Sequence, residues 1–370
     1  MSFSKVLDRL DDKKILQEIE QVSSNDIINI LNKDQINEKE FLQLLSPEGA
    51  KYIEEIAQNS RRNSLKHFGK AITLYTPLYI SNYCVNRCLY CSFNCNNSIM
   101  RNKLTLDEIR EEAEEVCKTG IKHVLLLTGE SKIHSPVEYI KDSVQILRDY
   151  FQSVVLEVYP MDTDEYVQLV GAGIDGVTIY QETYDREIYE SVHIKGPKRD
   201  YLYRLDTPER ACSAGVRTIN IGALIGLNDW RIEIFKVGLH AKYISEKFPE
   251  VEIGISLPRI KGISSTEKLS YKYYETNDRD FVQILAALKL FLPHCSINIS
   301  TRESKSMREN LIPIGVNKMS AGVSTEVGGH KVNKSSDKQF EISDESSVED
   351  VIKMIERVGY QPVLKDWMLL

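Results

Sequence analysis

Four cysteines fall within twelve positions, from Cys84 to Cys95, in a chain of 370 residues that contains seven cysteines in all. Structural zinc sites usually combine two separated pairs of Cys or His ligands, whereas these four form one compact group. The spacing Cys84-x3-Cys88-x2-Cys91 puts three thiols in one short loop, enough to hold three irons of a [4Fe-4S] cluster. The fourth iron would be open to a small molecule. Two alternatives stay open, namely Cys95 as a fourth ligand and a zinc ion in place of the cluster.

The composition limits where such a loop could work. The formal net charge is -7, so a broad basic surface for nucleic acid or an anionic membrane is not expected. No apolar run approaches the roughly 20 residues that span a bilayer, and the amino terminus lacks the apolar core of a secretory signal. We therefore expect a cytoplasmic protein, where clustered thiols bind metal or do redox chemistry more often than they form disulfides.

The elements that could position this loop lie after residue 70. There, short runs rich in Val, Ile and Leu alternate with segments of helical periodicity, which is the pattern of βαβ units. Eight strands are predicted, at residues 71–81, 123–130, 154–160, 176–183, 218–226, 251–259, 296–303 and 317–324. Helices are predicted between them, among others at residues 105–120, 137–151, 163–173 and 278–292.

Eight such strands predict an α/β fold of the complete (β/α)8 TIM-barrel type. Residues 1–70 are mostly helical in pattern and form a predicted amino-terminal extension. The barrel is expected over residues 71–325, and residues 326–370 are expected to form a carboxyl-terminal extension that packs on it. In such a barrel the carboxyl ends of the strands face the active site, and the first predicted strand delivers the cysteine loop to that end.

The cysteine spacing, with an aromatic residue just before the third cysteine, resembles the signature of radical S-adenosylmethionine (SAM) enzymes. The resemblance implies a [4Fe-4S] cluster on Cys84, Cys88 and Cys91, with SAM as the second cofactor. Thr128-Gly-Glu130 resembles the Gly-Gly-Glu element that holds the amino group of SAM, although Thr128 departs from Gly. The cofactor-binding residues that the resemblance implies are Tyr90, Thr128, Gly129, Glu130, Glu157, Arg204, Gly222 and Ile225.

These residues have expected roles and plainer alternatives. Glu157 is expected to accept the ribose hydroxyls and Arg204 to neutralise the SAM carboxylate. Gly222, together with Gly226, resembles the glycines that let a strand approach adenine, with Ile225 as the apolar contact. The alternatives are an ordinary salt bridge at the second strand end and a glycine at 222 that serves packing alone.

Longer motifs narrow the family. The segments "LLLTGE", "YQETY", "GPKRDYLYRLDTPERA", "GALIGLNDWR", "STRE" and "MSAG" run in this order along the chain. Together they resemble the 2-iminoacetate synthases, the ThiH family of thiamine thiazole biosynthesis, over about four fifths of the chain. The resemblance implies a lyase that cuts the Cα–Cβ bond of L-tyrosine to give 2-iminoacetate and p-cresol, while SAM is reductively cleaved to 5'-deoxyadenosine and methionine. It also implies two partners, the thiazole synthase ThiG and a flavodoxin- or ferredoxin-type electron donor.

The substrate residues follow from that expected activity. Arg259, at the end of the sixth predicted strand, is expected to bind the tyrosine carboxylate, with Ser256 orienting the amino acid and Arg302 in reserve. The alternative for either arginine is a structural ion pair at the barrel rim. Three other functions stay open: a tyrosine lyase of hydrogenase cofactor assembly, a tryptophan lyase, and a non-catalytic iron-sulfur carrier. The first of these families adds a carboxyl-terminal domain with its own cysteines, whereas no cysteine follows Cys295 here.

Overall fold

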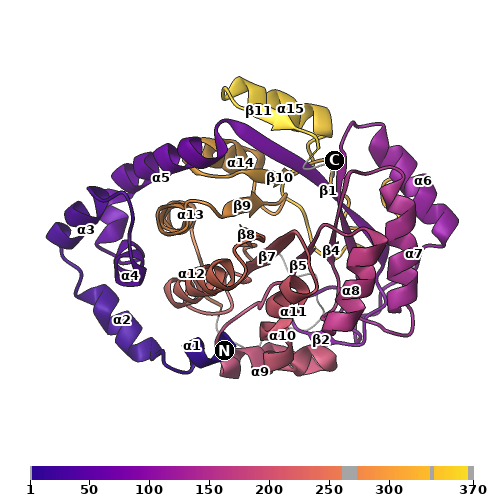
Figure 1. Cartoon of the computed structure of the whole chain (residues 1–370), viewed down its shortest axis with the longest axis horizontal. Coiled ribbons are helices and arrows are strands. Elements are labelled where there is room, and N and C mark those ends of the chain that lie inside the picture. The colour runs from indigo at the N-terminus through magenta and orange to yellow at the C-terminus, as the bar shows by residue number, and fades with distance from the viewer. Residues whose placement is uncertain (1, 261–272, 334–336, 366–370) are drawn as a thin grey trace.

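Parallel strands close into a barrel at the centre of the molecule (Figure 1). The computed structural model describes residues 2–260, 273–333 and 337–365. Within them, the sheet order is β10-β9-β8-β7-β5-β4-β3-β1, and β1 also pairs with β10, which closes the barrel. The barrel strands are β1 (Ala71–Ser81), β3 (His123–Thr128), β4 (Ser153–Glu157), β5 (Gly176–Thr178), β7 (Thr218–Gly222), β8 (Glu252–Ser256), β9 (Ser296–Ile299) and β10 (Lys318–Ser320). The predicted (β/α)8 barrel is confirmed.

Helices surround the barrel, as the periodicity predicts. The four predicted helices are present as α6 (Leu106–Cys117), α7 (Val137–Arg148), α8 (Thr163–Ala172) and α13 (Asp278–Phe291). The helix α6 begins at a capping box in which Thr105 and Glu108 bond each other's backbone N–H groups. The remaining elements on the barrel are α9 (Arg186–Val192), η2 (Pro197–Arg199), α10 (Tyr201–Leu205), α11 (Thr207–Ser213), α12 (Trp230–Lys247), α14 (Lys305–Leu311) and η3 (Ile312–Ile314).

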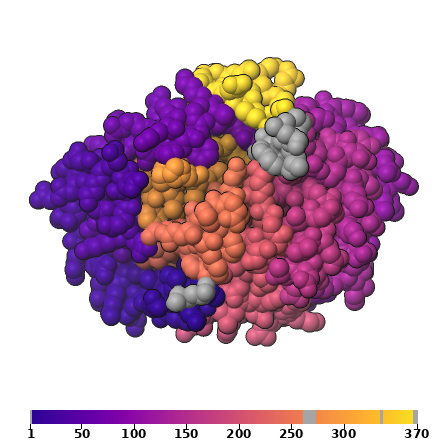
Figure 2. Space-filling view, viewed as in Figure 1, coloured from indigo at the N-terminus to yellow at the C-terminus, as the bar shows by residue number. Residues whose placement is uncertain are grey.

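The amino-terminal segment is helical, as predicted, and packs on the outside of the barrel against α12 and α13 (Figure 2). Phe41 stacks on Phe291 with ring centroids 4.5 Å apart. The amide of Gln283 donates to the carbonyls of Leu44 and Ser46 at 2.8 and 2.9 Å. These contacts fix the extension to one flank. Its elements are α1 (Ser4–Leu7), α2 (Asp12–Glu20), α3 (Ser24–Leu31), α4 (Glu38–Leu44), η1 (Gly49–Tyr52) and α5 (Ile53–Phe68).

The carboxyl-terminal segment returns to the first strand. After α15 (Val348–Arg357), the short strand β11 (Gln361–Val363) pairs in parallel with the start of β1. The strand β1 therefore bonds to β3, β10 and β11, an arrangement that the sequence pattern did not predict. No helix in the described part of the chain is long and apolar enough to cross a membrane.

Candidate active site

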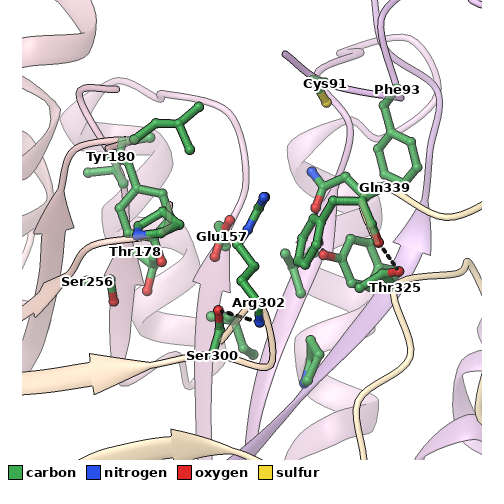
Figure 3. A pocket seen from close by; sticks show the side chains of 18 of the residues that line it. Cys91, Phe93, Glu157, Thr178, Tyr180, Ser256, Ser300, Arg302, Thr325 and Gln339 are labelled. Carbon is green, nitrogen blue, oxygen red and sulfur yellow. Dashed lines mark hydrogen bonds between the residues drawn. The ribbon is translucent and has the colours of Figure 1, made fainter. Parts of the chain in front are cut away.

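A cavity opens at the carboxyl ends of the barrel strands, and the three cysteines of the motif line it. Side chains from around the barrel face it, as Figure 3 shows for Cys91, Glu157, Tyr180, Ser256 and Arg302. Predicted site residues that line it are Cys84, Cys88, Cys91, Tyr90, Thr128, Gly129, Glu130, Glu157, Arg204, Ser256 and Arg302. The structure thus gathers most of the residues that were singled out from six separate segments of sequence.

The cysteine loop is held by one arginine beneath it. Nη1 of Arg101 donates to the carbonyls of Asn82 at 2.7 Å and Phe93 at 2.9 Å. Nη2 donates to the carbonyls of Asn94 at 2.7 Å and Asn97 at 3.4 Å. Because four backbone acceptors share one guanidinium, the loop has a defined shape without regular secondary structure.

A small ribbon and one asparagine tie this loop to the rest of the cavity wall. The strand β2 (Arg87–Cys88) pairs antiparallel with β6 (His193–Lys195). Asn86 donates to Oε2 of Glu130 at 2.5 Å and accepts from the backbone N–H of Lys198 at 3.0 Å. Gly196 has φ +98, and a Cβ there would lie 2.1 Å from Oδ1 of Asn86, so only glycine fits. The ribbon was not predicted, because its two short strands are about a hundred residues apart in the sequence.

The three thiols lie in the cavity wall, with Cys88 buried and Cys84 and Cys91 half-buried. Burial raises the pKa of Cys91 to about 11 and also raises the pKa values of Cys84 and Cys88. No three His, Cys, Asp or Glu side chains in the described residues are close enough to hold one metal ion. Thiols that share a cavity at wider spacing suit a cluster, in which each cysteine binds a different iron. Cys95 does not line the cavity, which fits a three-cysteine ligand set.

The end of β3 approaches the cysteine loop closely. A Cβ on Gly129 would lie 2.4 Å from the carbonyl oxygen of Tyr83, and the N–H of Gly129 donates to the carbonyl of Ser81 at 2.8 Å. Any larger residue at 129 would push the two segments apart. Glu130, next in the chain, is held by Asn86 and lines the cavity.

Three charged side chains form a largely buried group in the cavity wall, beside the cysteine loop. Nζ of Lys198 lies 2.7 Å and Nη2 of Arg204 lies 3.5 Å from Oε1 of Glu182. Burial alone would raise the pKa of Glu182, but the two cations hold it below its ordinary value. Glu182 has φ 71, a left-handed conformation that costs a non-glycine residue free energy and recurs at functional sites. Lys198 is a site residue that the sequence interpretation missed, although it lies inside the quoted segment "GPKRDYLYRLDTPERA".

Glu157 ends β4 in the middle of the cavity, facing Arg302 (Figure 3). Among the described residues its carboxylate has no hydrogen-bond or ion-pair partner. Burial, and then the charge of Glu182, raise the pKa of Glu157 to about 7. An unpaired carboxyl group in this place is available to a ligand, as the expected contact with ribose hydroxyls requires.

The prediction for Arg259 is corrected by its contacts. Its guanidinium bonds both carboxylate oxygens of Glu303, with Nε to Oε1 at 2.9 Å. It also donates to Oδ1 of Asp278 at 2.8 Å and to the carbonyl of Thr276 at 3.1 Å. Arg259 does not line the cavity. Its donors are used inside the protein, so it is the rim ion pair that was the stated alternative.

Arg302, the reserve, is the arginine that faces the cavity. Its guanidinium carbon lies 3.6 Å from the ring centroid of Phe340, and in the described part of the chain it has no ion-pair partner. Burial lowers its pKa, yet a guanidinium stays charged at neutral pH. A half-buried guanidinium without an ion-pair partner in the described residues suits an anionic ligand group. Gln339 and Phe340, which complete this wall, were not predicted, because they come from the carboxyl-terminal segment.

The adenine-contact prediction is also corrected. Gly222 and Ile225 do not line the cavity, whereas Leu224 does. A Cβ on Gly222 would lie 1.8 Å from the carbonyl oxygen of Ser256, so this glycine lets β7 and β8 approach each other. The side chain of Ile225 is in the core. Leu224, one residue before Ile225, is the apolar side chain of this segment that lines the cavity.

Comparison with known proteins agrees with this geometry. The family model of the radical SAM superfamily matches residues 78–236, and that of the Biotin and Thiamin Synthesis associated domain matches residues 256–361. The fold and the cysteine loop thus define a radical SAM enzyme. The chain is 35% identical to the 2-iminoacetate synthase of Escherichia coli (strain K12), over 99% of this chain and 97% of the relative. It belongs to the 2-iminoacetate synthase family.

Solved structures share the whole architecture. A crystal structure of HydG, a maturase of the [FeFe]-hydrogenase, superposes with a TM-score of 0.90 at 32% identity, covering 96% of this chain and 80% of HydG. Methylornithine synthase (PylB) superposes with a TM-score of 0.72 at 20% identity, covering 91% of this chain and 97% of PylB. The second likeness shows the fold alone.

Proposed function

We propose that this chain is a radical SAM lyase that cleaves the Cα–Cβ bond of L-tyrosine to give 2-iminoacetate and p-cresol for thiamine thiazole synthesis. The observation that carries the proposal is one cavity that joins the three-cysteine loop to Arg302, a half-buried cation without a carboxylate partner among the described residues. The first feature suits a cluster with an open iron, and the second suits an amino acid substrate. The near full-length similarity to a curated 2-iminoacetate synthase supports this particular reaction.

The cofactors would occupy the side of the cavity nearest the loop. Cys84, Cys88 and Cys91 would hold three irons of a [4Fe-4S] cluster, and Glu130, fixed by Asn86, would bind the amino group of SAM. Arg204 and Lys198 would place positive charge by the SAM carboxylate, and Glu157 would accept the ribose hydroxyls. When bound, the cluster and SAM supply one-electron reduction and hydrogen-atom abstraction.

The chain's own residues would then position the substrate. Arg302 would bind the tyrosine carboxylate through two parallel N–H bonds, with its guanidinium braced on the ring of Phe340. This contact would hold the amino group close to SAM, where a misplacement of about 1 Å can cost roughly a hundred-fold in rate. Closed barrel walls would keep water from the reactive fragments.

Two partners are part of the proposal. The product, an imine, hydrolyses in water, so transfer to the thiazole synthase ThiG is expected. The electron for SAM cleavage is expected from a flavodoxin- or ferredoxin-type protein. The net charge of -7 gives no support for nucleic acid as a partner.

The decisive experiment uses reconstituted, reduced enzyme with SAM and L-tyrosine under anaerobic conditions. We expect p-cresol and 5'-deoxyadenosine to form together, and neither to form without reductant. SAM cleavage without p-cresol would retain the radical SAM class and exclude tyrosine as the substrate. Cleavage of L-tryptophan in its place would identify a tryptophan lyase, and absence of SAM cleavage would favour an iron-sulfur carrier.

A role in hydrogenase maturation is the second candidate, because the HydG structure superposes so closely. It is less favoured, because the chain is 35% and 36% identical to two curated 2-iminoacetate synthases, against 32% to HydG. Complementation separates the two candidates. Growth of a thiamine auxotroph that lacks its own 2-iminoacetate synthase would support our proposal, and rescue of a maturase-deficient strain alone would overturn it.

A further inference from the structure

Four neutral polar side chains meet inside the barrel, one from each of the neighbouring strands β5, β7, β8 and β9. Nδ2 of Asn220 donates to Oγ of Ser256 at 2.8 Å and contacts Oγ1 of Thr178 at 3.5 Å. Nδ2 of Asn298 donates to Oδ1 of Asn220 at 3.0 Å. We call this group the floor cluster. Its members Thr178, Ser256 and Asn298 line the candidate active-site cavity.

The floor cluster is unusual for this fold. The interior of a (β/α)8 barrel is normally filled by layers of branched apolar side chains. Here the sequence also makes room for amides, since a Cβ on Gly254 would lie 2.8 Å from Oδ1 of Asn220. Polar groups in such a place lower the stability of the fold unless they are paired, so their presence calls for a ligand that uses them.

One acceptor in the floor cluster is left over. Oδ1 of Asn298 is buried and has no hydrogen-bond partner among the described residues. A buried acceptor without a donor is costly, and a ligand that supplies the donor removes that cost. Nδ2 of Asn298 is bonded to Asn220, so Oδ1 is the end of this amide that a ligand can use.

The charges of the cavity lie elsewhere, and this fixes the orientation of a substrate. Glu157 and Arg302 lie between Cys91 on one side and Thr178 and Ser256 on the other (Figure 3). The carboxylate of an amino acid substrate belongs with Arg302, on the side of the floor cluster that faces the cysteine loop. The side chain of the substrate then extends toward the neutral floor cluster.

The wall between these two ends suits an aromatic ring. Tyr75, Leu125 and Tyr180 line both the active-site cavity and a second cavity deeper in the barrel. They therefore stand where the two spaces meet, beside Thr178 and Asn298, which line both as well. Aromatic and apolar side chains here would flank a ring through offset or edge contacts.

We infer that the floor cluster is the subsite for the para-hydroxyl group of an aromatic amino acid, with Asn298 as the residue that selects for it. The inference rests on the proposed function. The phenol O–H donates to Oδ1 of Asn298, and the hydroxyl of Thr178 can donate to the phenol oxygen. A ring without the hydroxyl leaves Asn298 unpaired, and a site built to bond a substrate hydroxyl rejects the analogue that lacks it.

The test compares equilibrium binding of L-tyrosine and L-phenylalanine to the reconstituted enzyme with SAM, in wild type and in Asn298→Ala and Asn298→Leu. We expect wild type to prefer tyrosine. In both variants tyrosine should bind about 10- to 100-fold more weakly, as expected for one lost hydrogen bond to a buried group. The affinity for phenylalanine should stay the same or increase, so the variants should lose the preference for tyrosine over phenylalanine.

Thr301→Val is the matched control. Thr301 lines the same cavity and its Oγ1 is also buried without a partner in the described residues, but it lies outside the floor cluster, so its loss should keep the preference for tyrosine. If the Asn298 variants do not fold, Thr178→Val takes their place, because valine has nearly the shape of threonine. It should also lower the preference for tyrosine over phenylalanine.

An unchanged preference in the folded variants, or an equal loss of both ligands, overturns the assignment of Asn298. The p-cresol assay on wild type keeps the two proposals apart. If wild type forms p-cresol but the Asn298 variants still prefer tyrosine over phenylalanine, only the subsite proposal is contradicted. If wild type neither binds nor cleaves tyrosine, the proposed function is contradicted as well.

Discussion

Lys198 and Glu182 form an ion pair inside the cavity wall, with Nζ and Oε1 2.7 Å apart and both side chains at most 13% exposed. Arg204 adds a second cation to the same carboxylate oxygen. One carboxylate thus contacts two basic side chains from the segment after β6, and the group of three keeps a net positive charge. This segment also supplies the partner of Asn86, so the ion pair links one cavity wall to the cysteine loop.

Removing that carboxylate should destabilise the protein. Glu182→Gln leaves two buried cations without an anion, and breaking a buried pair from one side costs about 3 to 5 kcal/mol. Urea unfolding measures the loss. The matched control is Glu349→Gln, which breaks the exposed pair of Glu349 and Lys353 and should cost less than about 1 kcal/mol. Equal midpoints for the two variants would contradict the importance of the buried pair.

The cysteine ligand set is tested one thiol at a time. Cys84→Ala, Cys88→Ala and Cys91→Ala should each abolish SAM cleavage, because each removes a thiolate from a cluster that has three. Cys95→Ala should retain a cluster whose electron paramagnetic resonance spectrum changes when SAM is added. A spectrum that no longer responds to SAM in the Cys95 variant would make it a ligand.

Glu130 should matter for SAM and not for the cluster. Glu130→Ala removes the anion that would bind the SAM amino group, so we expect iron content to stay near that of wild type while SAM binds at least about ten-fold more weakly, as for a lost charged hydrogen bond. Equilibrium dialysis with SAM measures this. Glu138→Ala, on the exposed face of α7, is the control, and equal SAM affinity in the two variants would exclude the proposed contact.

Substitutions of Arg302 and Arg259 should affect different properties. The first should weaken the binding of L-tyrosine, and the second should lower the stability of the fold. Arg302→Ala should fold and assemble its cluster but bind L-tyrosine weaker by about 2 to 5 kcal/mol, or roughly 30- to several-thousand-fold. Arg302→Lys should be impaired too, since one ammonium cannot replace a bidentate guanidinium. Arg259→Ala should instead lower the free energy of unfolding by about 3 to 5 kcal/mol, because it removes the cation that contacts both carboxylate oxygens of the buried Glu303. The reverse pattern would return the substrate role to Arg259.

A buried lysine away from the cavity should make stability depend on pH. Nζ of Lys289 is 2.9 Å from the carbonyl of Cys295 and 2.9 Å from Oδ1 of Asn317, and burial lowers its pKa to about 7. In the unfolded chain the pKa is about 10.4. Between these values the unfolded chain binds the extra proton, so stability falls as pH falls from about 10 toward 7 and is then constant.

The measurement for Lys289 is a difference between two proteins. The free energy of unfolding of wild type minus that of Lys289→Met should rise with pH from about 7 to 10, by up to about 1.4 kcal/mol per pH unit. Lys39→Met, on the exposed face of α4, should show no such slope against wild type. A difference that does not change with pH would mean that Lys289 is charged in the folded protein.

Local pattern was sufficient for the barrel and for the cysteine loop. The strand His123–Thr128, for example, contains the continuous apolar run VLLL, as expected for a strand buried on both faces. Residues in short motifs, such as Cys84 in the cysteine spacing and Glu130 in the segment that resembles Gly-Gly-Glu, line one cavity, as predicted. What these features share is that the signal lies within a few residues of sequence.

The sequence did not predict which side chains pair with each other when the partners are far apart along the chain. Arg259 and Arg302 both follow strands and look alike in sequence. Which of them is neutralised depends on Glu303, which turns toward Arg259 across the rim, and on Phe340, which comes from a distant segment to support Arg302. The short strand β11 was missed for a related reason, since three residues carry too little pattern to show that they pair with β1.

The place of β1 in the barrel sets an order of events during synthesis. This strand carries the cysteine loop, yet its neighbours β10 and β11 are made only near residues 318 and 361. The thiols therefore leave the ribosome long before the barrel can close around them. Until residues 302 and 340 have been made, the cavity lacks the side chains of Arg302 and Phe340, and the three thiols of the nascent chain have no closed barrel to protect them from oxidants.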